Sequence, residues 1–176
     1  MSRASLAVRH LLDLGHESVG FVGDPKGNRP FSQRVLGARA SLAEAGLDPI
    51  KSLIEVSVPG IGIQDGVLAA KQLLTQALPG GILCGNDMMA FGVYRGLTSA
   101  GVRIPEDVAL IGYDDVEFAA NWVLPLTSVR QPTDNLGYRA AQLLLEHTMD
   151  WEGHVHQQVV LQPELIVRAS SDPRAR

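Results

Sequence analysis

Two adjacent carboxylates follow a short apolar run near the middle of the chain. The run at 108–111 is too short for a helix and predicts a buried parallel strand, which ends in Gly112-Tyr113-Asp114-Asp115. Ligands of open α/β sheets bind just beyond the carboxyl ends of the strands. A carboxylate placed there would accept hydrogen bonds from a small polar ligand. The alternative is that both acids only form a turn or cap the next helix, which are common roles of aspartate.

Three more polar side chains lie at or near the ends of other expected strands: Arg34, Asn86 and Gln131. With Asp114 they offer a cation, two amides and a carboxylate, which are the donors and acceptors that sugars and similar polyols need. Each hydrogen bond to a charged group contributes about 1.5–3 kcal/mol, so a few suffice for micromolar affinity. The pattern indicates binding without catalysis. For Arg34 the alternative is an ordinary solvated arginine.

The sequence supplies neither a catalytic nucleophile nor a metal site. It has no Gly-x-Ser-x-Gly motif, and the single cysteine, Cys84, lies in an apolar run typical of a buried thiol in a reducing compartment. His10 and His16 do not share a helix face, and His154-x-His156 lies in a polar stretch without cysteines or an acidic cluster. We therefore expect no enzymatic activity, no cofactor and no metal.

One glycine-rich stretch allows a different interpretation. The residues 60–66, Gly-Ile-Gly-Ile-Gln-Asp-Gly, follow an expected strand and precede an expected helix. They resemble a dinucleotide-binding fingerprint with one extra residue, and Asp87 follows at a suitable distance. The match is loose because Pro59 interrupts the tight passage from strand to turn. A nucleotide-dependent enzyme stays open here as an alternative.

Apolar periodicity predicts alternating helices and strands that would position these side chains. Helical stripes occur in 2–14, 35–45, 67–77, 89–100 and 133–149, with Ser32 as the expected cap of the second helix; strands are expected at 19–23, 53–58, 80–84, 108–111, within 124–132, and at 159–161 and 165–167. Alternation of this kind predicts a three-layer α/β/α sandwich with a mostly parallel sheet. The loops after the strands should gather at one edge.

Composition limits the classes of protein that this chain can represent. Its 176 residues suffice for one domain or one lobe, and 45% hydrophobic with 19% charged residues indicates a globular chain. The net charge of −4 and the lack of a lysine and arginine cluster give no electrostatic footprint for DNA. No apolar run is long enough to span a bilayer or to serve as a signal sequence, so we expect a cytoplasmic protein without a membrane partner.

Several motifs together are similar to those of one family. They are His-Leu-Leu-Asp-Leu-Gly-His at 10–16, Ser-Gln-Arg-Val-Leu-Gly at 32–37, Gly-Asn-Asp-Met-Met-Ala-Phe-Gly at 85–92, Ile-Pro-Glu-Asp-Val at 104–108 through Gly-Tyr-Asp-Asp at 112–115, Pro-Leu-Thr-Ser-Val-Arg-Gln-Pro at 125–132 and Glu-Leu-Ile-Val-Arg at 164–168. In order and spacing the chain resembles the effector-binding domain of LacI/GalR-type transcriptional repressors over nearly its whole length.

The resemblance implies a periplasmic-binding-protein-like fold of type I, in which two α/β lobes hold a small effector in the cleft between them. It implies that Arg34, Asn86 and Asp114 contact the effector and that Gln131 and Ile61 line the cleft. The implied effector is a sugar or related metabolite. Ile61 departs from the family pattern, since an aromatic residue commonly stacks on the ligand there. That departure argues against a simple pyranose.

The resemblance also implies a homodimer. Phe91, Arg95 and Trp122 correspond to the dimer face of the family. Aromatic side chains of this kind are common in interfaces, and the alternative is that Phe91 and Trp122 are buried in the core.

Aligned on the family, the chain divides into three parts. Residues 1–127 correspond to the C-terminal lobe, 128–157 to a crossover strand and helix of the N-terminal lobe, and 158–176 to closing strands that return to the C-terminal lobe. The family's helix-turn-helix headpiece has no counterpart in the sequence, so operator DNA would be bound only through that absent part. Helix 133–149 is expected to dock on a neighbouring chain or on its own lobe.

The expected function is therefore effector sensing in a transcriptional regulator. The main alternative is a solute-binding protein of a transport system, which shares the fold.

Overall fold

The computed structural model describes residues 5–24, 26–149, 157–172 and 174–175. In chain order its elements are α1 (Ser5–Asp13), β1 (Val19–Val22), α2 (Arg29–Glu44), α3 (Pro49–Ser52), β2 (Leu53–Val56), α4 (Ile63–Leu73), β3 (Gly81–Cys84), α5 (Asp87–Ser99), β4 (Ala109–Asp114), α6 (Glu117–Ala120), β5 (Thr127–Arg130), α7 (Thr133–Met149) and β6 (Glu164–Ile166). The expected alternation of helices and strands is confirmed.

The strands form a single sheet in the order β2-β1-β3-β4-β5-β6. All neighbours from β2 to β5 pair in parallel, and β6 pairs antiparallel with β5. The predicted mostly parallel sheet is therefore confirmed. Because five strands run the same way, the loops that follow them meet at one edge, which is the carboxyl edge of the sheet.

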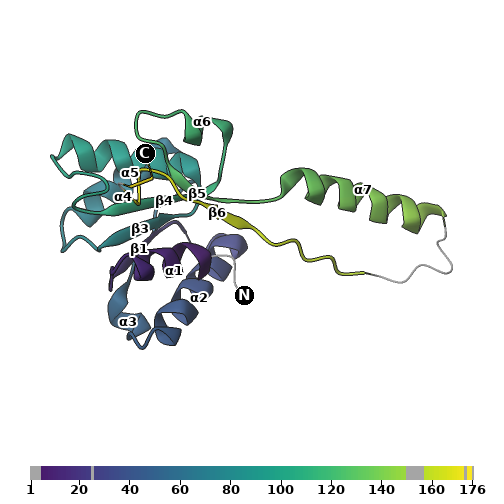
Figure 1. Cartoon of the computed structure of the whole chain (residues 1–176), viewed down its shortest axis with the longest axis horizontal. Helices are drawn as coiled ribbons and strands as arrows, with labels where there is room; N and C mark the ends of the chain where they lie inside the picture. Colours follow the sequence, from purple (N-terminus) through teal and green to yellow (C-terminus); the bar gives the residue numbers. More distant parts are fainter. Residues whose placement is uncertain (1–4, 25, 150–156, 173, 176) are drawn as a thin grey trace.

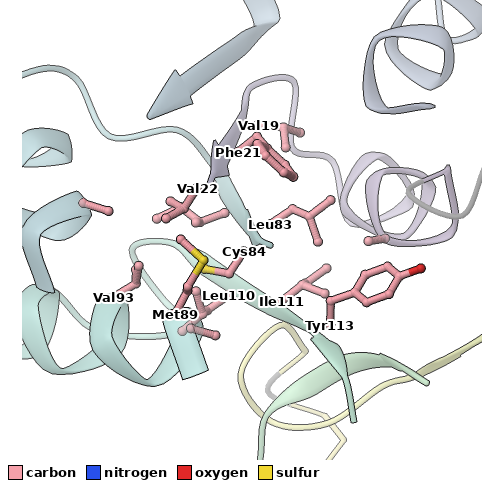
Figure 2. Close-up of a cluster of buried hydrophobic side chains, with 14 of the residues drawn as sticks. Val19, Phe21, Val22, Leu83, Cys84, Met89, Val93, Leu110, Ile111 and Tyr113 are labelled. Carbon is pink, nitrogen blue, oxygen red and sulfur yellow. The ribbon is translucent and has the colours of Figure 1, made fainter. Parts of the chain in front are cut away.

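Helices cover both faces of this sheet, as Figure 1 shows: α1 and α2 lie on one side, and α4 and α5 lie on the other. Neighbouring side chains of a strand alternate between the two layers. Figure 2 shows Phe21, Leu83 and Tyr113 on the side of α1 and α2, whereas Val22 and Cys84 face α4 and α5. All five are fully buried, which explains why the strands are apolar without alternation in the sequence.

The start of α2 differs from the expectation. Ser32 is not the cap, because its hydroxyl donates to the carbonyl of Arg29 inside the first turn. Asn28 is the N-cap and accepts a hydrogen bond from the amide of Phe31, while Pro30 occupies the first turn, where a missing N–H has no cost. Arg34 therefore lies one turn further from the helix N-terminus than the sequence indicated.

Three further elements differ from the expectation. The short helices α3 and α6 were not expected, and only one of the two expected closing strands is formed. Register explains the missing strand at 159–161. The last antiparallel pair joins Arg130 to Glu164, so the residues before Glu164 lie beyond the end of β5 and have no strand beside them. The expected boundary after residue 127 falls within β5, and the three-part division of the chain stays a prediction.

Helix α7 projects away from the sheet, as Figure 1 shows. None of its residues is buried, and five of its large side chains are mostly exposed: Leu136, Tyr138, Leu144, Leu145 and Met149. The expectation that this helix packs on its own lobe is wrong, because α7 lies away from the sheet and none of its residues is buried. Its docking on a neighbouring chain stays a prediction. Among the described residues, no helix combines the length and the apolar character that crossing a membrane requires.

The close contact between α4 and α5 predicts how a methyl group added at Gly92 would affect the stability of the fold. A Cβ added at Gly92 would lie 2.0 Å from the carbonyl oxygen of Ile63 and 2.8 Å from the Cα of Gly66, so both backbones block it. We expect Gly92→Ala to destabilise the fold by about 1–3 kcal/mol. Gly137→Ala is the matched control, since nothing lies within 4 Å of its added Cβ. Urea denaturation followed by circular dichroism measures the stability of both variants. Equal midpoints for the two would contradict the close contact between α4 and α5 at Gly92.

Candidate functional site

The carboxyl edge brings the five expected effector residues together. The amide nitrogen of Asn86 donates to the carbonyl of Ile61 at 3.0 Å, and Gln131 Nε2 donates to Asp114 Oδ1 at 2.8 Å. Arg34 donates to the carbonyl of Gly85, which precedes Asn86 in the chain. Residues that are distant in sequence, from α2, the end of β4 and the loops after β2, β3 and β5, therefore contribute to one polar surface.

Arg34 is held in place by aromatic rings. Its guanidinium carbon lies 3.5 Å from the ring centroid of Tyr113 and 5.2 Å from that of Phe31. Only 9% of the residue is exposed, so the alternative of a solvated surface arginine is wrong. A planar guanidinium between rings is oriented as well as charged, and lysine cannot reproduce this arrangement.

Asn86 is both a helix cap and a candidate ligand contact. Its Oδ1 accepts from the amide of Met89 at 2.8 Å, which satisfies a donor in the first turn of α5. A side-chain amide has two N–H donors and two lone pairs, so these contacts leave capacity for a ligand. The neighbouring Ile61 side chain is 57% exposed and provides an apolar surface beside the polar groups.

Asp114 is the carboxylate that points to the candidate site. Burial raises its pKa above the usual value, although the hydrogen bond from Gln131 and the charge of Arg34 lower the pKa in part. It does not cap the next helix, because the N-cap of α6 is Val116 and no side chain caps it. Its backbone φ is +104°, a left-handed value that is rare outside glycine.

Asp115 has a different role from its neighbour. Its side chain is only 3% exposed and forms ion pairs with Arg168 Nη1 at 2.6 Å and Arg130 Nη2 at 2.7 Å. Arg130 ends β5, and Arg168 follows β6 and also donates to the carbonyl of Leu126. This carboxylate therefore joins β4 to the two strands that lead toward and away from α7. The sequence analysis missed the ion pairs because they join positions that are 15 and 53 residues apart.

A third carboxylate, Asp87, lies behind the loop at 114–116. It is 1% exposed and accepts hydrogen bonds from the Val116 amide at 2.9 Å and from Ser128 Oγ at 2.6 Å. Burial raises the pKa of Asp87 to about 6, the two hydrogen bonds oppose this, and the charges of Asp114 and Asp115 raise the pKa further. The sequence analysis considered Asp87 only as a nucleotide contact and assigned no role to Ser128.

The geometry of the glycine-rich loop does not suit a nucleotide. The carboxylate of Asp65 occupies the start of α4 and accepts from the amide of Gly62 at 3.0 Å. A pyrophosphate would bind this same helix end and would meet a negative charge there. Asp87, the expected partner of a ribose hydroxyl, is enclosed. The fingerprint interpretation is therefore wrong in this structure.

Metal ligands do not cluster in the part of the chain that the structure describes: no group of three or more histidine, cysteine or acidic side chains could hold an ion there. His154 and His156 lie outside the described residues. Cys84 is buried, as expected, and burial with the charge of Asp87 raises the pKa of its thiol.

An open hollow adjoins the candidate site where the chain leaves the sheet for α7. It is lined by Asp114, Asp115 and the segment 130–135. Asp114 and Gln131 are thus accessible from this side, next to the crossover that leads to α7. The groups on the hollow are donors and acceptors of hydrogen bonds, with no nucleophile and base paired for catalysis.

The three expected dimer residues lie at an aromatic cluster on α5 and the segment after α6. Phe91 is buried, with ring centroids 4.4 Å from Trp122 and 5.7 Å from Phe118. Arg95 is exposed and Trp122 is half-buried. For Phe91 the burial alternative is the one that the structure shows, and Phe118, which the sequence analysis did not name, is the more exposed ring. The dimer role of these residues stays a prediction.

Comparison with known proteins identifies the family. The profile of the family described as "Periplasmic binding protein-like domain" matches residues 8–171. The chain belongs to this family. Among its relatives, the ribose operon repressor of Escherichia coli is 37% identical over 94% of this chain, and the transcriptional repressor PurR of Haemophilus influenzae is 35% identical over 94%. The alignments cover 50% and 49% of these relatives, so the periplasmic binding protein-like chain spans about half their length.

Solved structures agree with this assignment. A LacI family transcriptional regulator from Enterococcus faecium, described with bound ribose, superposes with a TM-score of 0.86 at 32% identity and covers 97% of this chain and 62% of its own. A lac repressor dimer bound to operator gives a TM-score of 0.82 at 27% identity over 96% of this chain and 57% of its own. The resemblance to LacI-type effector domains and the periplasmic-binding-protein-like fold are therefore confirmed.

The buried Asp87 predicts a pH-dependent stability. Because folding raises its pKa from 3.8 to about 6, its contribution to stability is complete below the lower value and is lost as the pH rises through the higher one. Asp87→Asn removes this titration. Between about pH 4 and about pH 7 the unfolding free energy of the variant should gain roughly 2–3 kcal/mol relative to wild type.

Urea denaturation across this pH range measures the difference, and other titrating groups cancel because both proteins share them. Asp107→Asn is the control, since the ion pair with Arg103 lowers the pKa of Asp107 to about 2 and keeps it charged throughout. Parallel profiles for wild type and Asp87→Asn would contradict the raised pKa.

Proposed function

We propose that this chain is the C-terminal lobe of the effector-binding domain of a LacI-type transcriptional regulator, acting in the cytoplasm. The observation that carries the proposal is the arrangement at the carboxyl edge, where Asp114, Gln131 and the stacked Arg34 lie beside the crossover to α7. A ligand bound there would touch the lobe and the crossover at once. Effector binding could thus change the relation of this lobe to a partner lobe.

The chemistry of the site suits a small polyhydroxylated ligand. A carboxylate, two amides and an oriented guanidinium provide acceptors and donors for several hydroxyl groups. The exposed side chain of Ile61 offers an aliphatic contact for the apolar edge of a compact ring. We infer a pentose as effector, and ribose is the first candidate because of the ribose operon repressor and the ribose-bound neighbours.

The domain organisation of the family supplies the partner lobe. Residues 1–127 and 158–176 would form this lobe, and 128–157 would belong to the N-terminal lobe, which would cover the exposed apolar side chains of α7. DNA binding would reside in a helix-turn-helix of the complete protein, and the complete protein would act as a homodimer. Catalysis has no place in this proposal.

A solute-binding protein is the other use of the fold. The relatives named above are transcriptional repressors, and the motif Arg130-Gln131-Pro132 is one of those in which the sequence resembles the repressor family. We therefore favour regulation over transport.

Asp114→Ala tests the proposal in the protein expressed from its complete gene. The variant removes the carboxylate that would accept ribose hydroxyls, so we expect ribose affinity to fall at least about tenfold, with operator binding retained. Isothermal titration with ribose and gel-shift assays with operator DNA measure the two properties. Asp107→Asn is the control because its exposed carboxylate pairs with Arg103 away from the site. An unchanged response of Asp114→Ala to ribose would remove Asp114 from the site.

A further inference from the structure

We propose that Asp87 is a positioning residue of the effector site, whose buried carboxylate fixes the loop 114–116 so that Asp114 faces the effector. This inference rests on the proposed role of Asp114 and extends it to a residue that cannot touch the ligand itself. Asp87 is enclosed behind the loop, at the start of α5.

The carboxylate controls two consecutive backbone amides of the loop. Asp87 Oδ2 accepts directly from the amide of Val116 at 2.9 Å. Asp87 Oδ1 accepts from Ser128 Oγ at 2.6 Å, and the same hydroxyl oxygen accepts from the amide of Asp115 at 3.0 Å. The position of the loop is thus set by one side chain on α5, directly at one amide and through β5 at the other.

The loop needs such a restraint because its backbone is strained. Asp114 has φ +104° and Asp115 has φ +53°, both in the left-handed region that L-residues other than glycine avoid. Such a conformation persists only where surrounding contacts determine it. The amides of Asp115 and Val116 are the backbone groups through which Asp87 and Ser128 provide that restraint.

The sheet is built to admit the carboxylate. A Cβ on Gly112 would lie 2.1 Å from Asp87 Oδ1, so only glycine at this place in β4 allows the approach. Groups that face Asp87 from other elements are Cys84 on β3, Ser128 on β5, and Asp114 and Asp115 at the end of β4. The charge of Asp115 is paired with Arg130 and Arg168, whereas Asp114 lies toward Arg34.

Nuclear magnetic resonance of the 176-residue chain tests the restraint without any ligand. We expect the amide signals of Asp115 and Val116 to shift with a midpoint near the pKa of Asp87, about 6, and to lose this shift in Asp87→Asn. Hydrogen exchange at Val116 should become about tenfold faster in Asp87→Ala, because the amide loses its acceptor. Amide signals far from the site, such as those of α2, should keep their wild-type behaviour.

Ribose binding to the complete regulator tests the consequence for the site. At about pH 7.5 we expect Asp87→Ala to weaken ribose binding by about tenfold or more, and Asp87→Asn and Ser128→Ala to weaken it less. Asp87→Asn keeps one acceptor for Val116, and Ser128→Ala keeps the direct bond to Val116, so each should retain part of the restraint. Asp107→Asn should bind as wild type. Asp87→Asn should not lose stability at this pH, so its weaker binding would not reflect unfolding.

The two measurements distinguish an error in the proposed effector from an error in the proposed role of Asp87. If wild type does not bind ribose, the proposed effector is wrong, and the amide signals still decide whether Asp87 restrains the loop. If Asp87→Ala does not fold, Ser128→Ala and Asp87→Asn decide the result. Wild-type titration and exchange at Asp115 and Val116 in both of these variants would overturn the proposal. So would unchanged ribose affinity in both, given a wild type that binds.

Discussion

The end of β4 depends on one buried carboxylate that must be accommodated between two layers of the fold. Asp87 enters from the start of α5, and its closest approach to the sheet is possible only because residue 112 is glycine. Each residue of the motif that follows then has a separate physical role. Tyr113 provides the ring under Arg34, Asp114 faces the open edge, and Asp115 is ion-paired inside. Four consecutive residues thus join the core, the candidate site and the crossover strands.

The two adjacent aspartates show how neighbouring side chains acquire different electrostatics. Asp114 has one amide donor and a nearby guanidinium, and burial still raises its pKa. Asp115 is ion-paired with two arginines, Arg130 at the end of β5 and Arg168 just after β6. A buried carboxylate with two cations serves the structure, since without them its charge would be buried and unpaired. A carboxylate with a partly open side is available to a ligand. The same residue type therefore serves a structural role and a binding role at successive positions.

Between β5 and α7 the side chains of the chain also change from buried to exposed. The side chains of β5 are buried up to Val129, and no residue of α7 is buried. Because its leucines are exposed along its length, contacts with the sheet do not hold this helix in position. Such an apolar surface marks a site of contact with another part of the protein or with a partner. Because this helix begins two residues after Gln131, a change in what covers it would act on the residue that is hydrogen-bonded to Asp114.

From the sequence alone one could predict the layer order, the mostly parallel sheet and the position of Arg34, Asn86, Asp114 and Gln131 at or near the ends of strands, because apolar periodicity and the alternation of strands with helices are local signals. The sequence did not determine the cap at Asn28, the register that leaves 159–161 without a partner strand, or the projection of α7. Those features depend on which segments meet in space. The same holds for the roles of Asp87, Ser128 and Arg168. Their partners are 29, 41 and 53 residues away, and only the tertiary structure brings each pair within hydrogen-bonding distance.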